Sequence, residues 1–344
     1  MTLSGKTGRI GVRLLEAIPT VLGIIVVCFL LTRALPGDPA AYFAGPMADA
    51  ESIERVRENL GLNESLPLQF ADYVSQLASG ELGTAVSTGR PVMQELSARL
   101  PASLELTLGA LIIAFTIAVP LGVLAATRPN TWIDHVCRFL VTAGVSLPTF
   151  FTGLALLYIF YYLLGWAPSP MGRLDFVYLP PETVTGFYTV DAVIAGEWEV
   201  AGAALAQLLL PMITLALFTL APIARMTRAT MIQMLSGDFV RTARAAGLGK
   251  RRVLITYAFR NALLPVITTL GMVFSFTLGA NVLVEKVFAW PGIGSFAIEA
   301  LVMSDYAAVQ GFVLCMAILF VVLNLLIDVT YTLIDPRVGL ETDA

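Results

Sequence analysis

The chain has 344 residues, of which 57% are hydrophobic and 13% charged, and its mean hydropathy is +0.80. A soluble domain cannot bury that much apolar surface, so the composition excludes an ordinary soluble enzyme and indicates an integral membrane protein. The small formal net charge of −4 provides no basic surface for nucleic acid.

Six apolar stretches are long enough to cross the membrane, because a helix needs roughly 20 residues to span about 30 Å of hydrocarbon. These stretches are residues 14–35, 104–126, 139–166, 203–225, 263–284 and 308–334. The predicted fold is therefore all-α, with six transmembrane helices in one membrane domain covering residues 1–344. An even number of spans places both termini on the same side.

The first insertion between spans, residues 36–100, is too polar to lie in lipid. Asp49 is predicted to cap a helix that Gly61 ends, and Pro67 and Pro91 suit the first turns of two more. We expect a small helical cap on the extracytoplasmic side.

The second insertion, residues 167–202, carries five acidic residues against a single arginine. Pro180, Pro181, Gly186 and Gly196 interrupt any regular pattern. This segment is predicted to form an ordered but irregular extracytoplasmic flap.

Ionisable residues within or beside the spans are costly in lipid and are therefore functional candidates. Glu16, Glu105 and Asp328 fall in this class, but all three lie toward the ends of spans. That position favours a structural or interfacial role over an ion relay, and both interpretations stay open. No catalytic residue, metal site or cofactor site is predicted, and neither Gly5-Lys6-Thr7 nor Gly249-Lys250 completes a phosphate-binding loop.

Lys and Arg are about twice as frequent on the side of the termini as on the other side, which by the positive-inside rule is cytoplasmic. The richest segment is the loop of residues 226–262, which together with Arg225 holds eight basic residues and one acid, Asp238. Anionic lipid headgroups alone could account for this charge. The helix signals indicate more, because Asp238 can cap a helix over residues 239–246, Gly247 can close it, and a second helix can start at Arg251.

A short helix of this kind, lying across the membrane surface, is a candidate docking element for a cytoplasmic partner. Ala243, Ala245 and Ala246 are expected to give it a face for close approach. Phe239 and Val240 are expected to serve as apolar anchors in a groove of the partner.

The stretch from Asp238 to Gly249, DFVRTARAAGLG, followed by RNALLP at Arg260 to Pro265, resembles the EAA loop of binding-protein-dependent ABC transporter permeases. The branch it resembles is the oligopeptide and dipeptide one. Arg241 stands where the general loop has Glu, and Arg is what the peptide branch usually shows. Further matching motifs along the chain are LPGDP at 35–39, GRPV at 89–92, FAWPGIG at 288–294, DY at 305–306, VQG at 309–311 and DPR at 335–337.

The resemblance implies a type I ABC importer permease in a bacterial inner membrane, multi-pass, with both termini in the cytoplasm. Its implied partners are a second homologous permease subunit, two ATP-binding subunits that hydrolyse ATP, an extracytoplasmic solute-binding protein and membrane lipid. The residues implied to couple the chain to the ATPase are Asp238, Phe239, Arg241, Ala243, Ala246 and Gly247.

Peptides are the leading cargo that the resemblance implies, and nickel chelates, glutathione or opine-like compounds are alternatives on the same scaffold. An ion-coupled secondary transporter is the rival from another class. It would be expected to show an inverted repeat and intramembrane ion-coupling groups.

Overall fold

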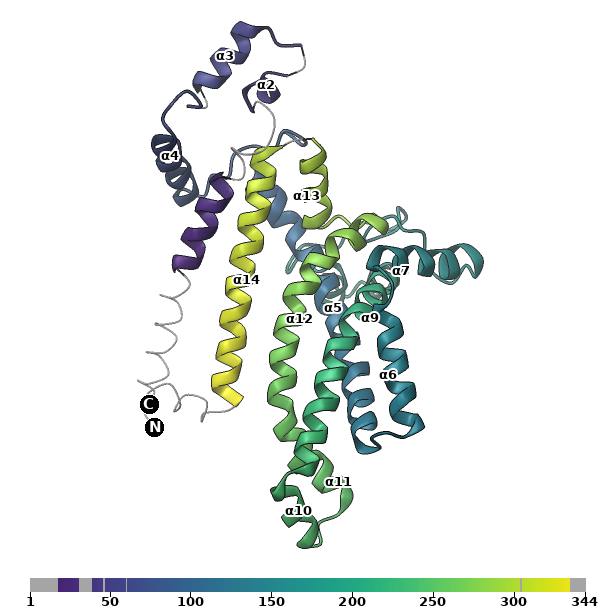
Figure 1. Ribbon diagram of the computed structural model, residues 1–344. Coiled ribbons are helices and arrows are strands. Elements are labelled where there is room, and N and C mark those ends of the chain that lie inside the picture. Colours follow the sequence, from purple (N-terminus) through teal and green to yellow (C-terminus); the bar gives the residue numbers. More distant parts are fainter. Residues whose placement is uncertain (1–17, 31–38, 46, 60, 304, 335–344) are drawn as a thin grey trace. The chain divides into compact units, whose positions relative to one another are not determined.

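The computed structural model describes residues 18–30, 39–45, 47–59, 61–303 and 305–334, and these residues are almost entirely helical (Figure 1). Their only β-type pairing is an isolated bridge between Thr84 and Pro91. The chain forms two compact units, one of residues 1–100 with 296–325 and the other of residues 101–295 with 326–344. The all-α fold class is confirmed.

The first unit contains a helix over Ile18–Leu30 and the short helices of the first insertion, α2 (Pro39–Ala44), α3 (Ala50–Asn59) and α4 (Leu66–Ala78). It also holds the start of α5 (Val92–Thr127), the end of α13 (Ile293–Val302) and most of α14 (Tyr306–Ile334). The ring of Phe29 packs edge-on against Phe70, with 5.1 Å between the ring centroids, so the first helix contacts α4.

Local signals predicted α3 and α4 of this insertion, whereas α2 was not predicted. The backbone N–H of Ser52 donates to Asp49 Oδ1 at 3.0 Å, which caps α3 and lowers the pKa of Asp49, and Gly61 ends the helix with φ +62. Pro67 lies in the first turn of α4, as predicted, whereas Pro91 lies one residue before α5.

Asp305, from the DY motif, is fully buried and holds two segments of the first unit together. Its carboxylate accepts from the backbone N–H of Ala308 in the first turn of α14 and from the N–H and hydroxyl of Ser87. Asp305 therefore caps α14 and fixes the turn that precedes α5.

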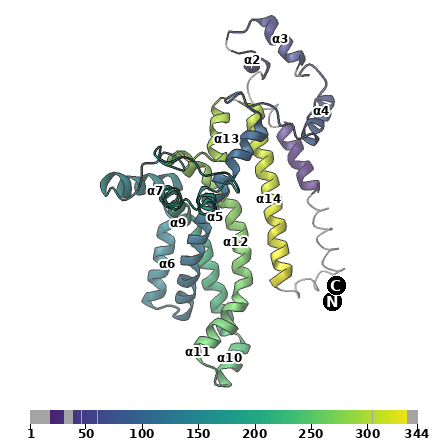
Figure 2. The ribbon, with the colours of Figure 1, turned by 180° about the vertical axis from the view of Figure 1, so that it is seen from behind.

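The second unit is a helical bundle. Its elements after α5 are α6 (Trp132–Val145), α7 (Thr149–Leu156), the π-helix η1 (Leu157–Leu163), α8 (Tyr188–Ala195), α9 (Trp198–Ser236), α10 (Asp238–Ala245), α11 (Lys250–Arg252), the π-helix η2 (Val253–Phe259) and α12 (Arg260–Val287). The long helices α9 and α12 run side by side, as both views show (Figures 1 and 2). Its main core gathers Leu106 of α5, Leu215 of α9 and Val284 of α12 around Trp290.

Within the described residues, four helical runs are long and apolar enough to cross a membrane: Val92–Thr127, Trp198–Ser236, Lys250–Val287 and Tyr306–Ile327. They contain the second, fourth and fifth predicted spans and most of the sixth. The first predicted span, 14–35, is described only over Ile18–Leu30, and the rest lies outside the described residues. The count of six spans stays a prediction.

The third predicted span, residues 139–166, is not one straight helix. It is the pair α6 and α7–η1, bent by 96° at a break over Ser146 to Pro148. Pro148 lacks an N–H and disfavours helical backbone at Leu147, so it favours a break at this point. Hydropathy alone could not find the break, because the apolar run continues through it.

Candidate functional site

The basic loop predicted between the fourth and fifth spans is almost wholly helical. α9 continues to Ser236, well past the predicted end of its span, and a helical run restarts at Lys250 and leads through η2 into α12. α10 lies between them at one end of the second unit (Figures 1 and 2). We call residues 237–256 the basic tip.

The start of α10 differs from the prediction by one position. Gly237 occupies the capping position with extended backbone (φ −69, ψ 150), and Asp238 is the first helical residue and makes no capping bond. Asp238 instead pairs with Arg241 at 3.2 Å, and both side chains are exposed. An acid in the first turn still complements the helix dipole, which explains why Asp238 suits this position.

The end of α10 is closed by Gly247, which has φ +77, as predicted. The N–H of Gly247 donates to the carbonyl of Arg244 at 3.0 Å, and the N–H of Leu248 donates to that of Ala243 at 3.2 Å. This pair of bonds is a Schellman motif, and it satisfies carbonyls that the last turn would otherwise leave unpaired.

The faces of α10 are divided differently from the prediction. Val240 and Ala243 are buried in a cluster with Val253, against which Leu248 and Tyr257 also pack. Being three residues apart, they share the face that α10 turns toward its own chain, so the expectation that they form the partner-facing surface is wrong. Asp238, Phe239, Arg241, Ala246 and Gly247 are exposed, and Phe239 keeps 41% of its surface accessible.

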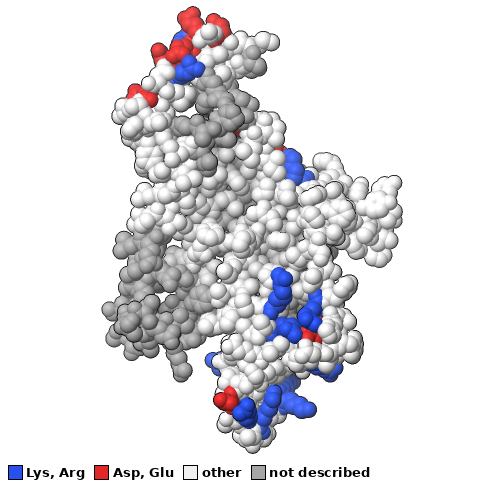
Figure 3. All heavy atoms as spheres, in the orientation of Figure 1, with Lys and Arg blue, Asp and Glu red and all other residues white. Residues whose placement is uncertain are grey.

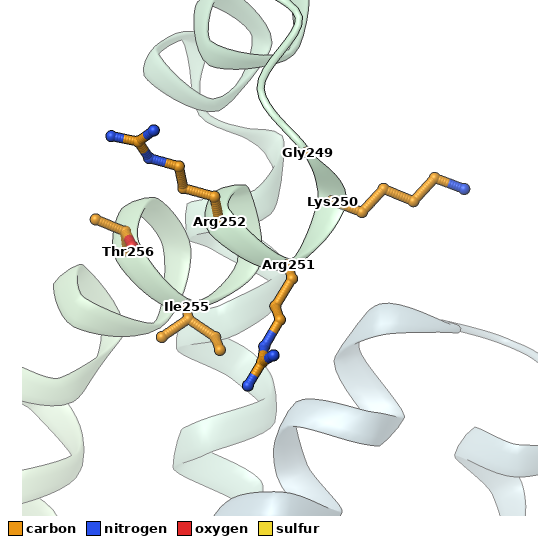
Figure 4. A pocket seen from close by; sticks show the side chains of 6 residues that line it. All are labelled: Gly249, Lys250, Arg251, Arg252, Ile255 and Thr256. Atoms are coloured by element: carbon orange, nitrogen blue, oxygen red, sulfur yellow. The ribbon is translucent and has the colours of Figure 1, made fainter.

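The exposed surface of the tip is strongly cationic, and Figure 3 shows Lys and Arg gathered at this end of the unit. Its exposed cations are Arg241, Arg244, Lys250, Arg251 and Arg252. An open groove of about 570 Å³ is lined by residues 249–252, Ile255 and Thr256, and its three cationic side chains point in different directions (Figure 4). Among the described residues, no acid forms an ion pair with Lys250, Arg251 or Arg252.

Arg228, another of the eight basic residues, has a different role. Its guanidinium donates two bonds of 2.7 Å to the fully buried carboxylate of Asp134, which also accepts from the N–H of Asn130. This bidentate pair joins α6 to α9 two turns before the basic tip. Sequence reasoning missed it because the partners lie 94 positions apart.

The flap of residues 167–202 is held by buried charges. Glu105 of α5 accepts from Arg173 at 2.7 Å and from the N–H and hydroxyl of Thr189. Arg173 also donates to the carbonyl of Gly186, and its guanidinium lies 3.5 Å from the centre of the Tyr188 ring. These contacts support the structural interpretation of Glu105; Glu16 and the side chain of Asp328 lie outside the described part.

Asp191 secures the same flap. Burial raises the pKa of Asp191, but hydrogen bonds from the N–H and hydroxyl of Thr185 and from the N–H of Gly186 outweigh it and hold the pKa below its ordinary value.

The FAWPGIG motif encloses a buried carboxylate. Glu285 accepts from the hydroxyl of Ser103, from the amide of Asn281 and from the N–H of Ser295. A side chain at Gly292 would clash with this carboxylate, and one at Gly294 would meet the backbone of Val282. The two glycines are therefore required for the turn to close over Glu285.

Comparison with known proteins identifies the class of this chain. A family described as "Binding-protein-dependent transport system inner membrane component" matches residues 118–340, and the corresponding N-terminal family matches residues 10–107. The chain belongs to this family.

Relatives in this family match nearly the whole chain. The probable D,D-dipeptide transport system permease protein DdpB of Escherichia coli (strain K12) is 44% identical over 319 residues, covering 93% of this chain and 94% of its own. The dipeptide permease DppB of Alkalihalophilus pseudofirmus is 39% identical, covering 95% and 97%. The glutathione permease GsiC of Salmonella typhi is 37% identical with the same coverage. The resemblance to the ABC dipeptide and oligopeptide permeases is confirmed, and the chain is a multi-pass inner membrane permease.

Proposed function

We propose that this permease is one subunit of an ATP-driven importer of short peptides, and that separate ATP-binding subunits dock on its basic tip. The observation that carries the proposal is the division of α10 into two faces. Val240 and Ala243 fix the helix to its own chain, while Phe239, Arg241 and Arg244 of α10 are exposed, as are the three cations of α11; Asp238 is the single acid of the tip.

The outward face fits a protein partner with an acidic groove. Cations exposed at a rim steer association and select partners of opposite charge, and an aromatic side chain such as Phe239 supplies an anchor for a pocket. Ala246 and Gly247 add no bulk at the end of α10. Ala243 contributes from the inside, by fixing the helix in place.

α10 is also placed to transmit a displacement to the long helices. Gly237 is the only break between α9 and α10, and Val253 connects α10 to the helical run that becomes α12. Since α9 and α12 pack side by side, a displacement of α10 would move both long helices. ATP-driven closure of the partner subunits would thereby tilt the spans between inward-open and outward-open states.

The remaining parts of the importer follow from the same assignment. A second homologous permease would complete the pathway, and an extracytoplasmic binding protein would deliver cargo to the helical cap and the flap. The basic tip and both termini would lie in the cytoplasm, in accord with the positive-inside rule. Peptide cargo is supported by the dipeptide permeases among the relatives, and the glutathione permeases support the alternative of a glutathione-like peptide.

The proposal is tested by purifying the tagged chain from native membranes in mild detergent and identifying the proteins that accompany it. Recovery of a second permease and ATP-binding subunits, with ATP hydrolysis stimulated by the binding protein and by peptides, is the expected result. A chain that purifies alone, and whose transport follows an ion gradient instead of ATP, would overturn it.

A further inference from the structure

In the bent pair of helices, α7–η1 forms an apolar segment that we call the arm. The sequence between Arg138 and Arg173 contains no charged residue, yet this stretch is not one straight crossing, since α7–η1 runs at 96° to α6. Both ribbon views show α7 extending sideways from the second unit (Figures 1 and 2). Its surface must be covered by something apolar.

The base of the arm is fixed firmly to its own unit. A side chain at Gly153 would come within 3.2 Å of the ring of Phe288 and 3.3 Å of Val287, so α7 closely approaches the end of α12. Leu156, Leu157 and Phe160 pack against the main core of the unit. Packing against its own unit therefore fixes the orientation of the arm.

The outward sides of the arm are apolar and aromatic. Phe151, Leu154, Tyr158 and Tyr162 are all exposed, and 72% of the surface of Tyr162 is accessible. A helix that is hydrophobic all round is stable only when covered, whereas a helix lying on the water surface of a membrane has a charged face. The arm therefore suits the apolar part of the bilayer and not its water surface.

The length of α6 sets the depth of the arm in the membrane. Its 14 residues rise about 21 Å, which is less than the roughly 30 Å of hydrocarbon, so α6 ends in the leaflet opposite the basic tip. The charged pair of Asp134 and Arg228 at its start marks the boundary on the tip side. An arm that turns by 96° at this depth runs near the opposite surface.

The aromatic residues fit that depth. The rings of Tyr158 and Tyr162 stack with 5.5 Å between centroids, and Tyr161 and Trp166 are also exposed. Among the described residues, nothing forms a hydrogen bond with the three tyrosine hydroxyls. Tyr and Trp concentrate at membrane interfaces because their rings sit in hydrocarbon while their polar groups reach lipid headgroups.

We propose that α7–η1 does not cross the membrane but lies along the leaflet opposite the basic tip, in direct contact with lipid. In the orientation proposed above this is the outer leaflet. The occupants of the surface are lipid acyl chains around Phe151 and Leu154 and lipid headgroups at the hydroxyls of Tyr158, Tyr161 and Tyr162.

The test is a depth measurement by spin labels on the complex in lipid nanodiscs, with Cys28, Cys137 and Cys315 replaced by alanine. Labels go one at a time at Phe151, Leu154, Ile159 and Tyr162, and the collision rates with oxygen and with a water-soluble nickel complex give the depth of each. Exposed positions on α6, Val136 and Leu140, provide a matched control that should become deeper by about 6 Å.

The proposal expects the four arm labels to be accessible to oxygen and to share one shallow depth within a few ångströms. A steady change of about 16 Å from Phe151 to Tyr162 would show a crossing helix and overturn it. Labels shielded from both oxygen and nickel would overturn it too, because the arm would then be covered by a second permease subunit. Neither result depends on ATP or on cargo.

Discussion

The flap and the basic tip, both in the second unit, use charge in opposite ways. At the flap, Arg173 and its partner Glu105 of α5 are buried, and each bonds to more than one group of the chain. In the tip, Lys250, Arg251 and Arg252 are exposed and have no acidic partner among the described residues. The buried charges of the flap site are bound within their own chain and hold it together, whereas the exposed charges of the tip form a surface available for a partner.

The largest expected loss of stability comes from breaking the buried ion pair of Glu105 and Arg173. Arg173→Ala would leave the carboxylate of Glu105 without its cation in a site closed to water, at a cost of about 3–5 kcal/mol. We expect a clearly lower thermal unfolding midpoint in detergent and faster proteolysis of the flap. Arg241→Ala, which removes an exposed cation from the tip, is the matched control and should leave the unfolding midpoint nearly unchanged. Equal losses in the two variants would contradict the comparison.

The second largest effect is expected at Gly247, where substitutions separate the influence of backbone conformation from that of side-chain volume. No atom lies within 4 Å of a side chain added at Gly247, but its φ of +77 disfavours β-branched residues. Gly247→Val should cost about 1–2 kcal/mol locally and weaken retention of the ATP-binding subunits, while the amount of permease in the membrane stays normal. Gly247→Asn, which tolerates this backbone, should retain most of the binding. Unchanged pull-down and uptake with valine would refute the role of this turn.

A smaller effect is expected from the groove of the basic tip. Replacing Lys250, Arg251 and Arg252 together by Gln should weaken association with the ATP-binding subunits by about fivefold at low salt, because exposed charges mainly steer association. The difference should shrink in high salt, and the unfolding midpoint should stay the same. Binding that is equally strong at every salt concentration would show that the groove takes no part.

The smallest effect is a pH dependence confined to acid. Because the pKa of Asp191 is lower in the folded protein, its carboxylate stabilises the flap above its unfolded pKa of about 3.9. That contribution is lost as the pH falls through the lower folded value. The unfolding midpoint of Asp191→Asn should therefore lie a constant amount below that of the unmodified protein from pH 7 to about 5. The gap should narrow in stronger acid, and a gap that widened instead would contradict the assignment.

The features that the sequence predicted correctly are those encoded by neighbouring residues. Gly247 closes α10 because a left-handed residue is needed where a short helix ends, and Asp49 caps α3 through a bond three residues along the chain. The features it missed depend on contacts between distant segments. Nothing near Asp134 indicates that Arg228 is its partner, and nothing near Val240 shows that Val253 would cover it.

The turn from α6 into α7 could be predicted from the sequence only in part. Pro148 was visible in the sequence, but hydropathy along residues 139–166 is continuous, and prolines at 120, 211 and 265 lie within uninterrupted helices. In this protein a proline interrupts a helix where the packing of the segments on both sides of it favours a bend. Here the close approach of Gly153 to Phe288 provides that packing.

The claim that the basic tip receives the ATP-binding subunit is tested most directly by a photo-reactive phenylalanine at Phe239, with the same probe at Trp198 as a control. Phe239 lies at the start of α10, just after the end of α9, whereas Trp198 is the first residue of α9 and is more exposed than Phe239. Illumination of the native complex should attach the ATP-binding subunit to the probe at Phe239 and not to the probe at Trp198. A probe at Phe239 that reacts only with lipid, while the ATP-binding subunits still co-purify, would contradict the account.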